Sequence, residues 1–400
     1  MLRPDTFALT ALLGLLTTIG PLSVDLYLPA LPEIGRELAA PTAQVQWTIS
    51  AYLVGFAFGQ VGYGPLADIH GRRPVLLVAL VAFCAATLVC AVASDIGWLI
   101  AARAIQAIGA SGAAVLARAV VRDLYHGARA GREMSIMGMI MGLAPVMAPT
   151  AGGVLQAAFG WRSCFYFLFA IGAVAVVLVR RLLPETLPTR PPGRFHLGDL
   201  FRGCGVIARH RGFRAHLALI SLSYAGLFAY ISGSPFVLQD FFGLSPIEFG
   251  LAFAAAAIGV VAGSWLAVHI VMRIGLNRTI GLGAAALAAG AIILALTTAM
   301  APGSTVAFVL PMMLYLAGMG LTMPQALAGA LQPFPDRAGT ASSLAGFVQQ
   351  TAAAAAGAIV GHFLASTAWP LVIVVAVTGT LTLAVWATTE QVREMPVRRS

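Results

Sequence analysis

The sequence predicts an all-α membrane protein with twelve transmembrane helices in two six-helix bundles. Its composition is the first reason: of 400 residues, 59% are hydrophobic and 10% are charged, with a mean hydropathy of +0.89. A soluble domain carries about a quarter charged residues, so this chain lacks the polar residues that a water-exposed surface needs. The second reason is that apolar runs of about 20 residues, the length of a helical span, follow one another along the chain.

Twelve apolar runs are long enough to cross the bilayer, and most connections between them are short. The first run begins after Met1-Leu2-Arg3 as a signal peptide would. It continues past Asp25 with no small-residue cleavage site, so we expect it to remain as a span. The predicted spans are residues 7–30, 44–66, 75–93, 98–120, 135–158, 163–183, 213–239, 247–270, 279–300, 303–330, 340–362 and 368–389.

One long connection divides the chain into two halves. It is rich in proline and then in arginine, and it separates an N-terminal bundle (1–183) from a C-terminal bundle (213–400) by a cytoplasmic linker (184–212). Four residues in the linker recur at helical spacing, which fits either a short helix on the inner membrane surface or a plain linker. They are Leu197, Leu200, Phe201 and Cys204.

The distribution of arginine orients the spans. If both termini are cytoplasmic, 21 of the 24 basic residues, all of them arginine, fall in cytoplasmic segments. Only Arg36 and Arg162 then lie outside, and Arg103 lies within a span. The positive-inside rule therefore predicts cytoplasmic termini. Because the basic residues lie between spans rather than on a folded basic face, the net charge of +9 does not indicate nucleic-acid binding.

The two halves share a pattern that indicates an internal duplication. A glycine-containing helix end and a tight basic turn occur between spans 2 and 3, in residues 64–73. A similar element occurs between spans 8 and 9, in residues 263–278. Many transporters are built from such repeats and bind their substrate at the midplane between them.

Two ionisable residues other than histidine stand clearly inside the spans, Asp25 and Arg103, and the predicted topology places both in the outer third of the bilayer. A charge there costs about 2.5–3.5 kcal/mol on insertion scales, so such a residue usually faces a wet cavity or a partner. Asp25 could bind and release a proton. The alternatives are that Asp25 caps a helix end or that the two residues form a static ion pair.

Three further groups of residues are candidates for function. The turn after span 2 could latch the inner surface; a positive-inside turn explains its arginines but not the spacing of its glycines and aspartate. It contains Gly64, Asp68, Gly71, Arg72 and Arg73. Span 5 should be bent and closely packed, for structural or functional reasons, by Pro145, Pro149, Gly152 and Gly153. Candidates for a substrate cavity are Gln106, Met137, Met141 and Tyr230, although methionines one turn apart more often face lipid or the protein core.

Other functional classes lack their signatures. No HExxH, GxSxG or pair of intramembrane carboxylates points to an enzyme, and the four cysteines show no metal-site spacing. The chain has no nucleotide-binding loop and no lysine to complete one, so energy must come from an ion gradient. A receptor has no need of two matched halves. We therefore expect no enzyme activity, cofactor or metal, and no nucleic-acid partner.

The motifs resemble those of the major facilitator superfamily. The residues from Gly64 to Pro74 look like its signature between helices 2 and 3, Arg103-Ala-Ile-Gln106 like its helix-4 motif, and Ala148-Pro149-Thr-Ala-Gly152-Gly153 like its antiporter motif, with alanine where glycine is common. Closer matches to the bicyclomycin/chloramphenicol resistance (Bcr/CflA) family are the segments 25–32, 234–238 and 338–343.

This resemblance implies a monomeric multidrug efflux transporter in the bacterial inner membrane, embedded in lipid, that exchanges protons for small-molecule drugs. Asp25 would be the proton site, Arg103 its coupling partner, and Asp68 with Arg72 part of an inner latch. The substrates would be small, mostly apolar compounds. The alternative is an exporter or proton symporter of a metabolite such as a sugar or an amino acid derivative.

Overall fold

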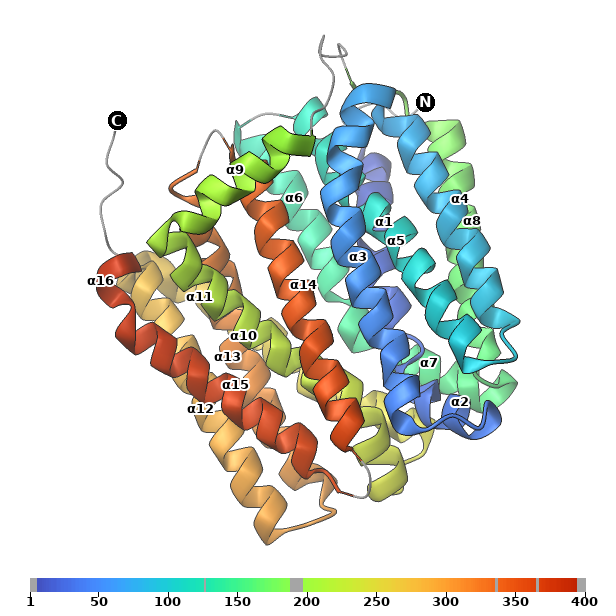
Figure 1. Ribbon diagram of the computed structural model, residues 1–400, viewed down its shortest axis with the longest axis vertical. Helices are drawn as coiled ribbons and strands as arrows, with labels where there is room; N and C mark the ends of the chain where they lie inside the picture. The colour runs from blue at the N-terminus through green and yellow to red at the C-terminus, as the bar shows by residue number, and fades with distance from the viewer. Residues whose placement is uncertain (1–5, 126, 188–196, 335–336, 365–366, 394–400) are drawn as a thin grey trace. The chain divides into compact units, whose positions relative to one another are not determined.

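The computed structural model describes residues 6–125, 127–187, 197–334, 337–364 and 367–393 (Figure 1). These residues are helical and contain no strand, which confirms the all-α prediction. The elements are α1 (Phe7–Asp25), η1 (Leu28–Ala30), α2 (Leu31–Glu37), α3 (Thr42–His70), α4 (Arg72–Ala91), α5 (Ile96–Leu124), α6 (Gly127–Gly142), α7 (Ala144–Phe159), α8 (Arg162–Leu182), α9 (Leu197–Arg209), α10 (Arg211–Pro235), η2 (Phe236–Phe241), α11 (Pro246–Ile274), α12 (Leu276–Met300), α13 (Thr305–Leu331), α14 (Ala338–Phe363), α15 (Trp369–Thr388) and α16 (Glu390–Arg393).

Each predicted span corresponds to a helix or to two or three consecutive helical segments. Eleven of these runs within the described residues are long and apolar enough to cross a membrane. The twelfth, α3, is 29 residues long and includes several glutamine and threonine side chains. The predicted multi-pass helical architecture is therefore confirmed.

The chain divides into two compact units. Unit 1 comprises Met1–Phe195 together with Pro246–Gly250, and unit 2 comprises His196–Ser245 together with Leu251–Ser400. In unit 1, α5 packs against α3, α4 and α1, and α4 also packs against α8. In unit 2, α10 packs against α13, α14 and α15, and α12 packs against α13 and α15. The linker helix α9 packs against α10 and α14, and residues 188–196 of the predicted linker lie outside the described residues.

Glycine lets the helices of unit 1 approach closely. A methyl group on Gly55 of α3 would collide with the backbone of Ala104 of α5. A methyl group on Gly109 of α5 would collide with the backbones of Ala79 and Phe83 of α4. Association of membrane helices relies on such close packing, because lipid tails are as apolar as the helix surfaces. These glycines therefore fix α5 at the centre of unit 1.

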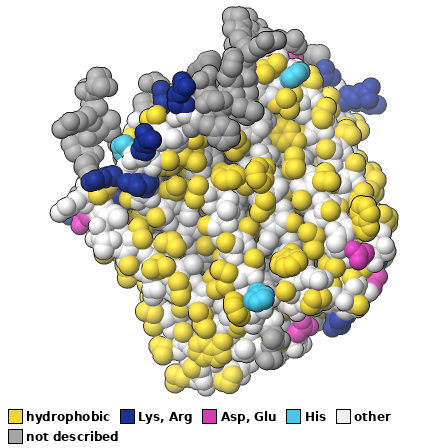
Figure 2. Space-filling view, viewed as in Figure 1, with side chains coloured by type: hydrophobic (Ala, Val, Ile, Leu, Met, Phe, Trp, Pro, Cys, Tyr) yellow, Lys and Arg dark blue, Asp and Glu magenta, His cyan; other side chains and the backbone are white. Residues whose placement is uncertain are grey.

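The outward faces of the helices are apolar. Figure 2 shows hydrophobic side chains spread along the lengths of the helices and arginine side chains toward helix ends. Large apolar side chains that are mostly exposed include Phe7, Phe159, Met272 and Met300. Soluble proteins rarely expose so much apolar surface to water, so these faces fit a lipid environment.

Candidate functional site

Arg103 is the centre of a buried polar cluster in unit 1. Its guanidinium, from the second turn of α5, is completely buried. Its Nη1 donates hydrogen bonds to the backbone carbonyl of Ser23 at 2.9 Å and to Oε1 of Gln106 at 2.5 Å. Gln106 in turn donates from Nε2 to the hydroxyl of Thr87 in α4 at 2.8 Å. The cluster thus connects α1, α4 and α5.

Two tyrosine rings enclose the guanidinium. The Cζ atom of Arg103 lies 4.3 Å from the ring centroid of Tyr27 and 4.3 Å from that of Tyr52. The hydroxyl of Tyr52 donates to the carbonyl of Gly20 at 3.1 Å, and that of Tyr27 lies 2.9 Å from Thr48 Oγ1. Aromatic faces attract a cation, and the attraction is larger without water. The guanidinium is therefore held by one backbone carbonyl, one side-chain amide and two aromatic faces.

Asp25 is the last residue of α1, two residues after the carbonyl that binds Arg103, and is 4% exposed. Among the described residues, none forms an ion pair with its carboxylate. As their predicted depth implies, Asp25 and Arg103 both lie near the C-terminal end of α1. The static ion pair between them, one of the alternatives, is not formed. The other alternative is that Asp25 caps a helix end; Asp25 is itself the last residue of α1, and the N-cap residues of η1 and α2 are Tyr27 and Ala30.

The candidate antiporter motif packs against the backbone at the end of α1. The helix of span 5 breaks at Leu143, so Pro145 lies in the first turn of α7, where proline is tolerated, and Pro149 lies inside α7. A methyl group on Gly152 would collide with the carbonyl of Leu26, the residue that follows Asp25. Gly153 is also buried. The glycine therefore lets α7 contact the backbone at the end of α1.

The predicted latch residues form a charged cluster at the start of α4. Arg72 forms ion pairs with Asp68 at 2.6 Å and with Asp123, at the end of α5, at 2.9 Å. Glu185, which follows α8, accepts hydrogen bonds from the backbone N–H groups of Arg72 at 2.9 Å and of Arg73 at 3.2 Å. The cluster ties together α3, α4, α5 and the segment after α8.

Two glycines of this motif differ in role. Gly71 has a φ of +97° and lies beside Glu185, in a conformation that residues with a side chain rarely adopt. A methyl group on Gly64 would meet no atom within 4 Å, so the structure shows no close helix approach there. Arg73 donates from Nη2 to the carbonyl of Arg180 in α8.

Unit 2 contains the counterpart of this turn. Gly275, with a φ of +84°, precedes α12 as Gly71 precedes α4. Asn277 accepts a hydrogen bond at its backbone carbonyl from Trp386 Nε1 at 3.0 Å and at Oδ1 from Arg393 Nε at 3.0 Å. The matching backbone geometry agrees with the predicted duplication, but the bonded groups differ.

The four cavity candidates lie in different surroundings. Gln106 is part of the Arg103 cluster, Met137 is buried, and Met141 is 39% exposed. Tyr230 of α10 is fully buried and stacks on Phe253 of α11, with ring centroids 5.2 Å apart. The structure does not bring these four residues into one site.

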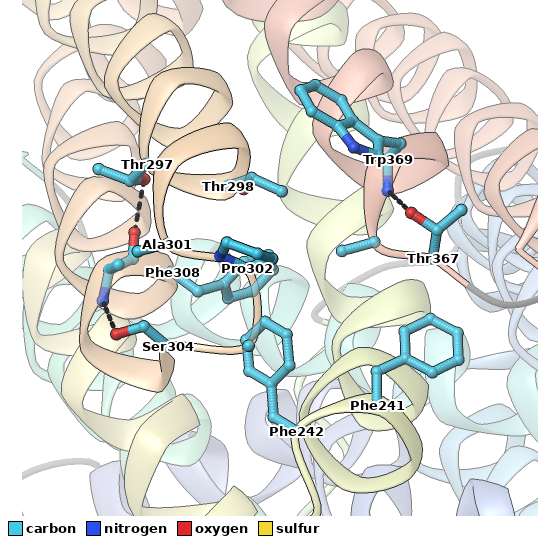
Figure 3. Close-up of a pocket in the computed structure, with 13 residues that line it drawn as sticks. Phe241, Phe242, Thr297, Thr298, Ala301, Pro302, Ser304, Phe308, Thr367 and Trp369 are labelled. Carbon is cyan, nitrogen blue, oxygen red and sulfur yellow. Dashed lines mark hydrogen bonds between the residues drawn. The ribbon is translucent and has the colours of Figure 1, made fainter.

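A pocket of about 330 Å³ lies in unit 2, where η2, the α12–α13 turn and the start of α15 meet. In Figure 3, Phe241 from η2, Phe242 directly after it and Phe308 from α13 contribute rings, and Trp369 and Thr367 lie across from them. None of the four cavity candidates lines this pocket. The lining is aromatic and hydroxyl-bearing and includes no charged side chain.

Sequence reasoning missed three acidic residues and the two tyrosines. Asp123 and Glu185 stand in charged segments beside the predicted spans, where they look like ordinary loop residues; the opposite charge of Arg72 was the available signal. Tyr27 and Tyr52 are ordinary residues for a span. The third acid, Glu133, is 6% exposed, although it precedes the predicted span 135–158.

Comparison with known proteins identifies the family. A model of the Major Facilitator Superfamily matches residues 13–358. The uncharacterized MFS-type transporter YdgK of Bacillus subtilis is 34% identical over 349 residues, 86% of each chain. The bicyclomycin resistance protein homolog of Haemophilus influenzae is 28% identical over 92% of each chain, and multidrug resistance protein D of Escherichia coli is 30% identical over 87% of each chain.

Solved structures agree on the fold. The crystal structure of a D-xylose–proton symporter superposes with a TM-score of 0.76 and 17% sequence identity, covering 96% of this chain and 97% of the symporter. At that identity the likeness concerns the fold alone. From the family model and the relatives together, the chain belongs to the Major Facilitator Superfamily and is a multi-pass membrane transporter.

Proposed function

We propose that this transporter exports small, mostly apolar compounds across the bacterial inner membrane in exchange for protons, and that Asp25 binds the proton. The names of two relatives, a bicyclomycin resistance protein homolog and multidrug resistance protein D, support drug export. The position of Asp25 supports proton exchange.

The single observation that carries the proposal is that a buried carboxylate stands at the C-terminal end of α1 without an ion-pair partner among the described residues. The C-terminal end of a helix carries partial negative charge from its unbonded carbonyls. A carboxylate there is repelled when charged, whereas a protonated carboxyl group can donate a hydrogen bond. Protonation of Asp25 therefore removes an electrostatic repulsion at the end of α1 and adds a hydrogen-bond donor there.

Coupling follows from this change. If drug and proton compete for the region of Asp25, each lowers the affinity for the other by the same factor. A proton on Asp25 removes its charge and reduces the cost of closing a dry cavity around it. Arg103, fixed by Ser23, Gln106 and the two tyrosines, would be the coupling partner near the end of α1. The charged cluster at Arg72 would hold one conformation of unit 1.

The test measures protons released when drug is added to the detergent-purified transporter in weak buffer. The wild type should release protons. Asp25→Asn, which imitates the protonated form, should fold and bind drug but release no proton from this site. Asp95→Asn is the matched control: Asp95 caps α5 by accepting from the N–H groups of Gly97 and Trp98, and asparagine is an equally good cap. Unchanged release from Asp25→Asn would overturn the assignment.

The direction and the substrate class need a second measurement. In inverted vesicles with an imposed proton gradient, the proposed exporter should accumulate drug against its gradient. Uptake of a sugar or an amino acid derivative along with protons, and no drug transport, would instead establish the metabolite symporter. Resistance profiles of expressing cells against a compound panel would then define the substrates.

A further inference from the structure

Glu133 is a second buried carboxylate, at the other end of α1 from Asp25. It lies in the second turn of α6 and is 6% exposed. The hydroxyl of Thr10, near the start of α1, donates a hydrogen bond to its Oε2 at 2.5 Å. Thr10 itself is 5% exposed. This pair therefore lies inside the contact between α1 and α6.

The two carboxylates are well separated along α1. Thr10 and Asp25 are 15 residues apart in the sequence, which corresponds to about 22 Å along a helix that rises about 1.5 Å per residue. Glu133 is therefore not part of the Arg103 cluster. In the orientation predicted from the arginines, it belongs to the inner half of the span and Asp25 to the outer half.

No ion pair joins Glu133 to an arginine anywhere in the described residues. Arg129, one turn earlier in α6, places its guanidinium over the ring of Tyr125 at 4.9 Å, and Arg132 is exposed. The ionisable side chains of α6 and of the elements packed against it, α1, α5 and α7, other than Glu133 itself, are Asp25, Arg103, Arg118, Arg122, Asp123, Arg129 and Arg132.

A carboxylate without a cation is costly in such a place, and its cost falls when it takes up a proton. One oxygen already accepts from Thr10, so the other oxygen remains for the proton. The hydroxyl can rotate, and it can donate to the charged form or accept from the neutral form. The pair can thus hold either protonation state without moving either helix backbone.

We propose that Glu133, oriented by Thr10, is a second proton-binding residue of the transporter, at the inner end of α1. This inference rests on the proposed proton exchange for its role in transport, but proton binding by Glu133 can be measured independently.

Infrared difference spectroscopy of the purified full-length protein tests proton binding directly, because a protonated carboxyl group has a C=O stretch that the carboxylate lacks. A pH-dependent band should appear in the wild type and be missing in Glu133→Gln, in which the amide oxygen still accepts from Thr10. The band should remain in Glu33→Gln, the matched control, since Glu33 also accepts a side-chain hydrogen bond, from Gln156. If no band is lost in Glu133→Gln, the inference is wrong.

Thr10→Val provides a second test that leaves the carboxylate in place. Removing the hydroxyl should move the frequency of the same band, and an unmoved band would contradict the role given to Thr10. Proton release on drug addition then separates the two proposals. If Glu133→Gln releases one proton fewer per drug while the proton from Asp25 is still released, both proposals are supported. If Glu133→Gln releases fewer protons but Asp25→Asn releases as many as the wild type, Glu133 remains a proton-binding residue and the role of Asp25 is overturned.

Discussion

Arg103 is accommodated in an apolar span by several weak interactions, two hydrogen bonds and two ring contacts, rather than by an ion pair with one carboxylate. Two hydrogen bonds from Nη1 and two aromatic faces act on one planar group. A planar guanidinium can donate in its plane and present its faces to rings at the same time, and an ammonium cannot. The site is therefore specific for arginine and not only for positive charge.

Arg103→Lys should accordingly destabilise the protein although it keeps the charge. The ammonium nitrogen of lysine is one bond closer to the backbone than Nη1 and has no flat face for the two rings, so the carbonyl of Ser23 and the amide of Gln106 would lose their donor, and each buried group left unpaired costs about 1–3 kcal/mol. We expect a lower melting temperature in detergent and loss of drug transport. Arg36→Lys, at an exposed arginine of α2, is the control and should melt like the wild type; equal melting of both variants would contradict this description.

Sequence reasoning found Asp25 and Arg103 because charges stand out in apolar runs. It could not find Tyr27 and Tyr52, since nothing in a sequence distinguishes a tyrosine that encloses a cation from one that faces lipid. It left Glu133 outside span 5 because the neighbouring Arg129 and Arg132 look like a loop. Only the contact with Thr10, 123 residues away, shows that the carboxylate is buried.

Among the helices, α6 and α7 carry the largest departure from a regular span. The prolines of span 5 predicted a bend, and the structure places a break at Leu143 with Pro145 just after it. The sequence could not tell what the glycines of α7 contact. That Gly152 faces the carbonyl of Leu26 depends on how α7 lies against α1, which no local pattern encodes.

Gly152→Ala should therefore move the backbone next to Asp25. The added methyl group collides with a main-chain oxygen, which cannot rotate away, and overpacking of this kind costs about 1–3 kcal/mol. We expect a lower melting temperature and slower drug transport. Gly138→Ala in α6 is the control, because its methyl group would meet no atom within 4 Å. Equal transport by the two variants would show that α7 does not constrain Asp25.

For the whole molecule, composition and run length were sufficient to predict the helical membrane architecture. All twelve predicted spans have helical counterparts, because about 20 apolar residues can satisfy their backbone in a membrane only as a helix. The bonds that hold each turn were not predictable in the same way. They join residues more than 100 positions apart, such as Arg72 and Glu185.

The predicted orientation can be tested with the native cysteines. Cys84, Cys90 and Cys164 are buried, whereas Cys204 in the linker helix α9 is partly exposed. A membrane-impermeant maleimide should label Cys204 in inverted vesicles and leave it unlabelled in intact cells. Ser304→Cys, in the turn before α13, should react from outside. Labelling of Cys204 in intact cells would reverse the predicted topology.

The turns that follow Gly71 and Gly275 share one backbone shape but are stabilised by different forces. The first depends on ion pairs with Asp68, whose side chain is 49% exposed, and Asp123; the second depends on an indole and on an arginine that donates to an amide and to carbonyls. Dissolved salt screens exposed ion pairs far more than buried ones. A rise in the ionic strength of the surrounding solution should thus weaken the Arg72–Asp68 pair, whereas the Arg72–Asp123 pair, with side chains 10% and 14% exposed, and the hydrogen bonds at Asn277 should change little.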